Sequence, residues 1–560
     1  MRTKGLKMNG IKAAGITKRE TAVSAVTALL YSFFLTAGWQ MERKGQYVFF
    51  SPWPHLAFLV LFLILFPVIL WSLRILHRGR AVGPAGAGEA GSRRNPAACR
   101  GFRRWKGIPV FLLRQWGMLL GWLPVLLAGY PGFFCYDAAY QFNEVAAGVY
   151  DMQHPLLHTW LLGRTLTLAQ AYLGSYEAGV LIFCVTQMLV ITACFCLVLE
   201  LMERRGAGRR LLLLSWLYYA LYPTCALFGL CTTKDSLFTA FVTLHLMALF
   251  ELLKEGEAFF KRPAWVALYA ATAVLAMLFR NNGFYSWLIF LPILLLLSRG
   301  SRKKAAVLTI SCMGVFLLVT RGLAGLLEAE DRNGLREMLS VPAQQLARTY
   351  AEEGAAFFEE EDRARLYSFI PEEDLSRYSP KLADPVKANL HVGLNSTLPD
   401  FVRLWLRIGI KAPGSYIDAL LLQTYQAWYP FTIPDGYCGE NAKPRYRGSE
   451  SCYFALETEE PAKAQSRLPG LLGFYRFFSR HMTFDTVPVL PILFSVGTML
   501  WVLLYALAYA LCYSKRAAAG LLLMLLCLCL TCLLGPIVLV RYYLVLFFAL
   551  PLVAGVNQLV

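Results

Sequence analysis

The chain has 560 residues, of which 57% are hydrophobic and only 16% are charged. Soluble domains are typically about 45–50% apolar and about 25% charged, so this composition excludes an ordinary soluble enzyme, a disordered protein and a disulfide-stapled secreted domain. The net charge is +18, but 23 of the 36 acidic residues lie between Leu326 and Asp485. The basic residues elsewhere stand mostly in short segments between apolar runs, which indicates membrane topology rather than nucleic-acid binding.

Twelve apolar runs have the length and composition expected of membrane helices, because a bilayer needs about 20 apolar residues per span. They are predicted at residues 21–39, 55–76, 108–130, 176–201, 211–230, 236–253, 264–280, 284–298, 305–325, 486–512, 517–537 and 541–558. The fold class is therefore predicted to be an all-α polytopic membrane protein with about twelve transmembrane helices.

Six net-basic segments fall on alternate connections between these runs. They are residues 1–20, 78–106, 203–210, 254–262, 299–304 and 514–516. Because Lys and Arg accumulate on the cytoplasmic side of membranes, the sequence predicts a multi-pass protein of the cell membrane with both termini in the cytoplasm.

This topology divides the chain into five regions. They are an N-terminal tail with three spans and a basic linker (1–130), a first large external loop (131–175), spans four to nine (176–325), an extracytoplasmic loop domain (326–485) and the last three spans (486–560). Residues 401–430 mix apolar, aromatic and basic side chains. This mixture is compatible with a helix on the outer membrane surface and equally with a core helix of the loop domain.

Acids, histidines and basic groups gather at the predicted external ends of the spans. The first external loop carries Asp137, Gln141, His154 and His158, and later turns carry Lys234-Asp235, Arg280-Asn281 and Arg541-Tyr542. Basic groups at an outer interface suit a lipid phosphate or pyrophosphate. A nearby carboxylate suits general-base work on an acceptor hydroxyl, so the set predicts surface chemistry.

Several of these residues also have a simpler interpretation. Lys234 and Arg541 are compatible with basic side chains that reach lipid headgroups. Asp235 is compatible with a helix N-cap, and His154 before Pro155 with the start of a helix. The joint pattern on one membrane face favours a site over these separate interpretations.

Most of the fourteen cysteines lie in apolar runs, where they act as small hydrophobic side chains. Cys438 and Cys452 instead share a polar segment, and a disulfide between them is predicted if that segment is extracytoplasmic. A zinc site built on cysteines is not expected.

The chain resembles the GT-C class of membrane glycosyltransferases, most closely a bacterial branch of uncharacterised multispan proteins. The resemblance rests on a series of short motifs. They are Pro131-Gly132 with Asp137 and Gln141, His154-Pro155 with His158, Lys234-Asp235, Arg280-Asn281-Asn282-Gly283, SVPAQQLAR at 340–348, Asp384-Pro385-Val386-Lys387 and Arg541-Tyr542.

The resemblance implies a polyprenyl-phosphate sugar donor and a cell-envelope glycan, lipid or protein acceptor. It makes Asp137 a general base or a ligand of a divalent metal ion, and it makes residues 154–173 an interfacial helix. His154 is predicted to position substrate or act as a secondary acid/base. Lys234, Arg280 and Arg541 are predicted to hold the donor phosphate, with Gln141, His158, Asp235, Asn281 and Tyr542 as further substrate-binding residues.

The sequence departs from the simple pattern of that class in two ways. Two spans precede the one that leads to Asp137, and no DxD or paired-acid motif stands there, so metal dependence stays open. A glycan polymerase or ligase, with Arg403 and Arg407 dominant, is an alternative. A transporter or flippase of lipid-linked sugars is another, but it is expected to line a path with charges in mid-membrane.

Overall fold

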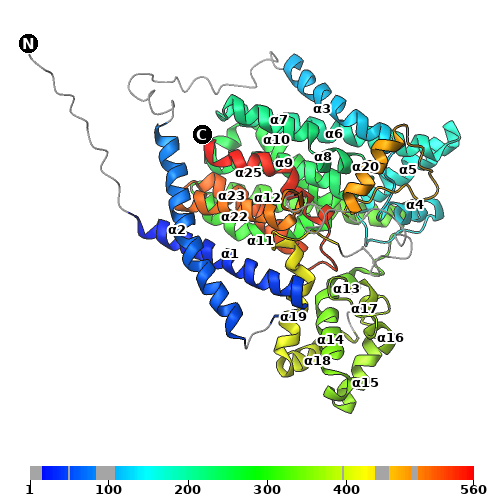
Figure 1. Cartoon of the computed structure of the whole chain (residues 1–560). Helices are drawn as coiled ribbons and strands as arrows, with labels where there is room; N and C mark the ends of the chain where they lie inside the picture. Colours follow the sequence, from blue (N-terminus) through cyan, green and yellow to red (C-terminus); the bar gives the residue numbers. More distant parts are fainter. Residues whose placement is uncertain are drawn as a thin grey trace, which may run out of the picture.

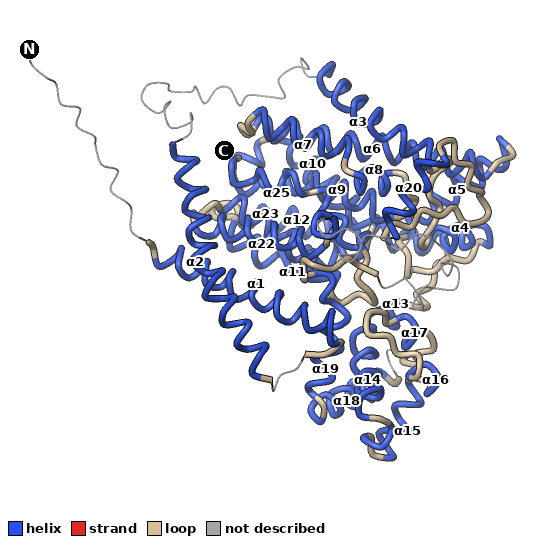
Figure 2. Tube along the Cα trace, viewed as in Figure 1, coloured by secondary structure: helices blue, strands red, loops and turns tan. Residues whose placement is uncertain are grey.

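The computed structural model describes residues 16–47, 51–82, 108–393, 396–435, 453–480 and 490–559. Helices follow one another along this part of the chain, joined by loops (Figure 1). Figure 2 shows helix and loop but no strand among the described residues, and the only sheet-like pairings there are isolated bridges. The part of the chain that can be described is therefore all-α, as the sequence predicts.

Each predicted apolar run coincides, in its described part, with an apolar helix or a short series of helices. These are α1 (Lys18–Lys44), α2 (Pro52–Val82), α3 (Ile108–Ala128), α6 (Tyr176–Arg204), α7 (Arg209–Leu221) with α8 (Pro223–Gly229), α9 (Lys234–Glu255), α10 (Pro263–Phe279), α11 (Asn281–Leu297), α12 (Arg302–Leu327), α21 (Leu490–Phe494) with α22 (Val496–Cys512), α23 (Arg516–Cys532), and the series η7 (Val540–Tyr543), α24 (Leu544–Phe548), α25 (Leu550–Gly555) and η8 (Val556–Gln558).

Six of the described helices are long and apolar enough to cross a membrane: α1, α2, α3, α6, α9 and α12. The number rises to eight if two bent series, α7 with α8 and η7 to η8, each count as one span. Pro223 begins α8 at the 49° bend of the first series, as expected of a residue that cannot donate a helical hydrogen bond. The remaining α10, α11, α22 and α23 are shorter apolar helices of 17 residues each. These helices confirm a membrane protein.

Helix α9 lies at the centre of the bundle and α2 at its edge. In α9, 89% of the most apolar window is buried inside the protein, where the helix packs against α6, α10, α23 and α24. In α2 the corresponding share is 11%, and residues such as Leu63 and Trp71 are exposed. Apolar side chains left outside a membrane bundle face lipid, so α2 belongs to its periphery.

A separate helical domain follows α12 and projects from the bundle, as the yellow-green helices of Figure 1 show. Its helices are α13 (Gly334–Met338), α14 (Ser340–Glu353), α15 (Glu360–Phe369), α16 (Glu372–Leu375), α17 (Asp384–Lys387), α18 (Leu398–Lys411) and α19 (Pro413–Thr424). Phe401, Leu404 and Ile408 of α18 are buried in the core of this domain, together with Leu346 and Leu366. This burial favours the core-helix interpretation for the first part of residues 401–430.

The predicted loop domain of residues 326–485 divides into two parts in the structure. Residues from Leu339 to Tyr416 share the core of the projecting domain. Tyr453, Phe454 and Leu456 instead pack into the core of the membrane bundle, and α20 (Pro469–Arg480) contacts α3. The large apolar side chains that follow residue 452 are buried against the bundle, so this second part of the loop belongs to the bundle and not to the projecting domain.

The projecting domain is attached to two loops of the bundle. Glu330 pairs with Asp151 in a parallel bridge, and the Asn333 side chain donates a 2.7 Å hydrogen bond to Oδ2 of Asp151. On another side, the Ala383 amide donates a 2.9 Å hydrogen bond to the Pro536 carbonyl. These two loops lead to His154 and Arg541, so the domain supports the backbone on either side of the charged cluster described next.

Candidate functional site

Four separate parts of the chain meet at one end of the bundle and bring five charged side chains together. Asp137 follows α3, Lys234 and Asp235 lie in the first turn of α9, Arg280 separates α10 from α11, and Arg541 lies in η7. All five were predicted from the sequence. We refer to them as the charged cluster.

Local hydrogen bonding explains how the α9 end of the cluster forms. Thr233 is the N-cap of α9, and its hydroxyl donates a 2.9 Å bond to Oδ2 of Asp235. An acid in the first turn is favoured by the helix dipole. The interpretation of Asp235 as the N-cap is therefore wrong by two residues, because the threonine hydroxyl serves that role.

The loop that carries Asp137 is bonded to the loop that precedes α9. The Phe133 amide donates to the Leu230 carbonyl at 3.2 Å, and the Thr232 amide donates to the Phe133 carbonyl at 3.0 Å. Tyr136 then adopts a left-handed backbone conformation with φ of 61°. A non-glycine residue in this region carries backbone strain, which is often found at functional sites.

Asp137 is the shared counter-ion of two cations. Its Oδ2 lies 3.1 Å from Nζ of Lys234 and 2.8 Å from Nη1 of Arg541. The side chains of Lys234 and Arg541 are 13% and 5% exposed. Both basic groups therefore point into the protein, and the interpretation that they reach lipid headgroups is wrong.

Asp235 forms the second ionic centre of the cluster. It is fully buried and paired with Arg280, and its Oδ2 also lies 3.6 Å from Nη1 of Arg541. Arg541 thus joins both carboxylates. Three cations and two carboxylates leave the charged cluster with one net positive charge.

Aromatic rings hold the two arginines of the cluster. The guanidinium carbon of Arg280 lies 4.6 Å from the ring centre of Tyr542, and that of Arg541 lies 4.9 Å from the same ring. Arg541 also lies 4.5 Å from the ring centre of Tyr136. Such cation–π contacts restrict the planar guanidinium groups. Sequence reasoning selected Tyr542 but missed Tyr136, whose position beside the conspicuous Asp137 was the available signal.

His154 extends the cluster toward a narrow cavity. Its Nδ1 lies 3.1 Å from Nζ of Lys234. Burial and the Lys234 charge lower the pKa of His154 to about 4, so the ring is neutral at pH 7. Neutral Nδ1 then accepts a hydrogen bond from the Lys234 ammonium group, which places the ring proton on Nε2.

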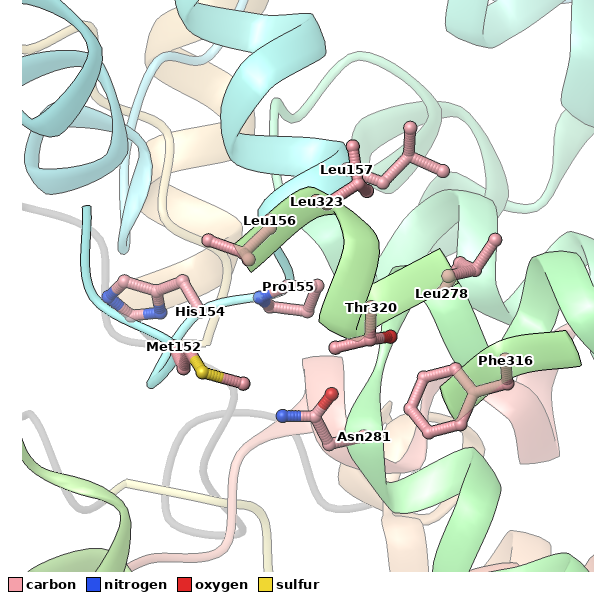
Figure 3. Close-up of a pocket in the computed structure, with 10 residues that line it drawn as sticks. All are labelled: Met152, His154, Pro155, Leu156, Leu157, Leu278, Asn281, Phe316, Thr320 and Leu323. Atoms are coloured by element: carbon pink, nitrogen blue, oxygen red, sulfur yellow. The ribbon is translucent and has the colours of Figure 1, made fainter. Parts of the chain in front are cut away.

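The cavity beside His154 measures about 30 Å³ and is lined also by Asn281, Phe316 and Thr320. Figure 3 shows the Asn281 amide and the His154 ring among its labelled lining residues. A space of this size holds about one water molecule. Asn281 was predicted as a substrate-binding residue, and the structure places it at the cavity wall.

The electrostatic surroundings of Asp137 affect the role predicted for it. Burial alone would raise its pKa, but the Arg541 and Lys234 charges hold the pKa of Asp137 well below its ordinary value. A carboxylate of such low pKa is ionised at neutral pH and is a weak general base. It is well suited to hold Lys234 and Arg541 in place.

Glu144 is a candidate that the sequence reasoning did not select. It lies on α4 (Ala138–Ala147), and burial raises its pKa to about 7. Its Oε2 is buried and has no hydrogen-bond partner among the described residues. Glu144 stands seven residues after Asp137, two helical turns along the same face, and this spacing was the signal that could have found it.

Gln141, His158 and Asp235 lie inside the protein rather than at the cavity. The Gln141 amide donates a 2.9 Å bond to the Thr159 hydroxyl. His158 lies on α5 (Leu156–Leu173) and makes edge contacts with the rings of Phe183 and Phe279, and neither of its nitrogens has a partner among the described residues. Their assignment to substrate stays a prediction.

The donor set at the cluster does not suit a divalent metal ion, because Asp137 is already paired with two cations. Within the described ranges, no three His, Cys, Asp or Glu side chains lie close enough together to hold a metal ion. Cys438 and Cys452, the predicted disulfide partners, lie outside the described residues.

The fold and the cluster define an all-α membrane protein with a buried ionic site at one end of its bundle. A family model described as a family of unknown function (DUF6020) matches residues 148–555, and the chain belongs to this family. The match spans every member of the charged cluster except Asp137. No curated protein and no solved structure matches the chain.

Proposed function

We propose that the protein is an integral membrane glycosyltransferase of the GT-C type. It transfers a sugar from a polyprenyl-phosphate donor to a cell-envelope glycan, lipid or protein acceptor on the outer face of the cell membrane. The observation that carries this proposal is the charged cluster, with its one unmatched positive charge.

The arginines and lysine of the cluster suit the donor phosphate. Arg280 and Arg541 present planar guanidinium groups that recognise phosphate oxygens in pairs. Asp137 and Asp235 hold these groups in place before a donor arrives. Positive charge fixed near the leaving phosphate stabilises the negative charge that develops there as the glycosidic bond breaks.

Proton transfer from the acceptor hydroxyl needs a group whose pKa lies near the working pH. Glu144 meets this condition better than Asp137, since its pKa is raised by burial to about 7. We therefore assign the general base to Glu144 and keep Asp137 as the ionised partner of Lys234 and Arg541. Neutral His154, held by Lys234, positions the acceptor or donor through Nε2.

The contacts within the cluster support the twelve-span topology. Asp137, Lys234, Arg280 and Arg541 lie together, so an even number of crossings must separate each from the next. In the twelve-span count, Asp137 and Lys234 are separated by two spans, α6 and α7–α8. Lys234 and Arg280 are separated by α9 and α10, and Arg280 and Arg541 are separated by α11, α12, α21–α22 and α23. Each interval then contains an even number of spans.

Contacts at the other end of the bundle support the same arrangement. Arg205, after α6, pairs with Glu251 and Glu255 at the end of α9. Lys304, at the start of α12, pairs with Glu257 at 2.5 Å. All of these residues belong to or adjoin the segments that the basic charge assigns to the cytoplasm, so the cluster is expected on the outer face, with both termini inside.

Donor binding requires some movement, because the cavity beside His154 has room for about one water. A polyprenyl-phosphate sugar is far larger. The loops on either side of the cluster are held by the projecting domain through Asp151 and Pro536. Rearrangement of these attachments would open the cluster to donor and acceptor together.

The test uses purified protein in lipid nanodiscs with a panel of polyprenyl-phosphate sugars and envelope extracts as acceptors. Wild type is expected to transfer sugar. Asp137→Asn is expected to lower the rate about 100- to 1,000-fold because it releases two phosphate-binding cations, and Arg541→Ala is expected to weaken donor binding. Arg403→Ala is the matched control, since that arginine is exposed and paired with Asp400 on α18.

Each alternative function corresponds to a different result. Full transfer by Asp137→Asn together with loss of activity in Arg403→Ala would replace the proposal with a polymerase or ligase that uses the projecting domain. Movement of lipid-linked sugar across the bilayer without transfer would identify a flippase.

A further inference from the structure

Two buried cysteines lie against each other in the loops that lead to Asp137 and Lys234. Sγ of Cys135 is 3.5 Å from Sγ of Cys231. Cys135 is two residues before Asp137, and Cys231 is three residues before Lys234. The pair therefore joins the two loops that carry this ion pair.

The backbone keeps the two sulfurs close. Phe133 and Cys231 pair in a parallel bridge, flanked by hydrogen bonds from Phe133 to Leu230 and from Thr232 to Phe133. Both cysteines are at least 98% buried, so both sulfurs are enclosed by the protein. The separation of the sulfurs is longer than the bonding distance of about 2.05 Å. To form the bond, the Cys135 sulfur must give up its 3.3 Å hydrogen bond to the Ala455 carbonyl and move toward Cys231.

We propose that Cys135 and Cys231 form a disulfide bond that fixes the Asp137 loop to the start of α9. The proposal rests on the outer-face placement of the cluster, where disulfides persist, and not on sugar transfer. It adds a covalent bond at a point where the structure shows hydrogen bonds and one ion pair.

The chemistry requires an oxidant, which we take to be a protein disulfide of the cell envelope. One cysteine thiolate attacks that disulfide and forms a mixed disulfide, and the second thiolate then displaces the carrier. The two thiols lose two electrons and two protons, and the carrier disulfide gains them as a dithiol. Burial and the neighbouring Cys231 raise the pKa of Cys135, so exchange is slow once the protein has folded and the bond must form during folding.

The test begins with wild type, so it does not depend on whether a variant folds. Protein made with export to the envelope is purified without reductant, denatured, alkylated with N-ethylmaleimide, digested and analysed by mass spectrometry. The expected result is a linked pair of peptides that contain Cys135 and Cys231, with both unlabelled. After reduction, both become labelled.

Two variants add a measurement of stability. Cys231→Ser is expected to lower the thermal unfolding temperature in detergent and to make that temperature less dependent on reductant than in wild type. Cys194→Ser, a buried cysteine within α6, is the matched control and is expected to keep both the linked peptides and the reductant dependence. Free, fully labelled Cys135 and Cys231 in wild type, or linkage of either to another cysteine, would overturn the proposal. Sugar transfer can fail in a correctly linked protein, so the two proposals fail separately.

Discussion

Asp235 and Arg280 form a buried ion pair at the point where α9 begins and α10 ends. The side chain of Asp235 is 0% exposed and that of Arg280 is 9% exposed. Removing both charges from water is costly, and their attraction offsets that cost only while both partners are present. Arg541 depends on the same carboxylate, because its other partner, Asp137, is shared with Lys234.

We expect Asp235→Asn to destabilise the protein by about 3–5 kcal/mol, since it leaves Arg280 buried without a counter-ion. The measurement is thermal or denaturant unfolding in detergent. Asp400→Asn is the control, because Asp400 pairs with exposed Arg403 on α18 and its loss should change stability by less than about 0.5 kcal/mol. Equal effects of the two substitutions would contradict a stabilising ion pair between Asp235 and Arg280.

The role proposed for Glu144 predicts that the transfer rate depends on pH. A general base works only when deprotonated, so the wild-type transfer rate is expected to rise as the pH passes through about 7, the value to which burial raises the pKa of Glu144. Glu144→Gln is expected to lower the rate about 100- to 10,000-fold and to abolish this rise.

The measurement is the initial transfer rate across neutral pH, with Asp137→Asn measured in parallel. Asp137 is already ionised in this range, so the rise should persist in whatever activity that variant retains. A pH profile that Glu144→Gln leaves unchanged would assign the proton to another group.

At the scale of elements, close helix contacts fix the bundle. Helix α3 crosses α7 at Gly121, where an added Cβ would lie 2.5 Å from the backbone oxygen of Ala220. A backbone oxygen cannot move aside as a flexible side chain can. Trp122, the next residue, is fully buried and donates a 2.9 Å hydrogen bond from Nε1 to the Tyr219 carbonyl. Small residues at such crossings are typical of membrane helix packing.

Gly121→Leu is therefore expected to force α3 away from α7 and to destabilise the protein by at least about 1–3 kcal/mol. Fluorescence-detected size exclusion and thermal unfolding in detergent would show lower folded yield and a lower midpoint. Gly314→Leu is the matched control, because Gly314 lies within α12 and an added Cβ there meets nothing within 4 Å. Similar losses in both variants would show that the glycine contact is not responsible.

Hydrophobic runs were sufficient to predict the apolar helices of the bundle, because lipid requires continuous apolar segments whose backbone is internally bonded. They did not show that α7 and α8 form a bent pair or that Tyr453 and Phe454 pack into the bundle. Those features depend on which helices become neighbours. A period in the sequence reveals a buried face but not the partner that covers it.

The candidate site was predictable to a similar extent. Polar residues at helix ends stood out against apolar surroundings, and the structure brings Asp137, Lys234, Asp235, Arg280 and Arg541 into contact as a group. Tyr136 and Glu144 escaped prediction because a tyrosine and an acid in a polar loop are ordinary. What distinguishes them is a left-handed backbone in one case and a buried oxygen with a raised pKa in the other, and both follow from tertiary packing.

At the scale of the whole molecule, the projecting domain contacts the loops beside the charged cluster, so both are expected on the same membrane face. The domain follows α12 and contacts the loops before His154 and Arg541. Labelling with a membrane-impermeant maleimide tests its side in a background without reactive cysteines. A cysteine at Gly354, at the end of α14, is expected to react from outside intact cells.

A cysteine at Gly88, which lies in the basic linker outside the described residues, is the control and is expected to react only after the cells are permeabilised. Reversed labelling would place the cluster in the cytoplasm. It would also remove both the outer-face donor and the oxidising environment that the Cys135–Cys231 bond requires.

The shared role of Arg541 also has a consequence for biosynthesis. Asp137 and Lys234 balance each other, as do Asp235 and Arg280, so the first four charges of the cluster sum to zero. Arg541 is made 404 residues after Asp137, and only its arrival gives the cluster a net positive charge. Until Arg541 has been made, the other four charges of the cluster sum to zero, so the proposed affinity for a donor phosphate is expected only after Arg541 has joined them.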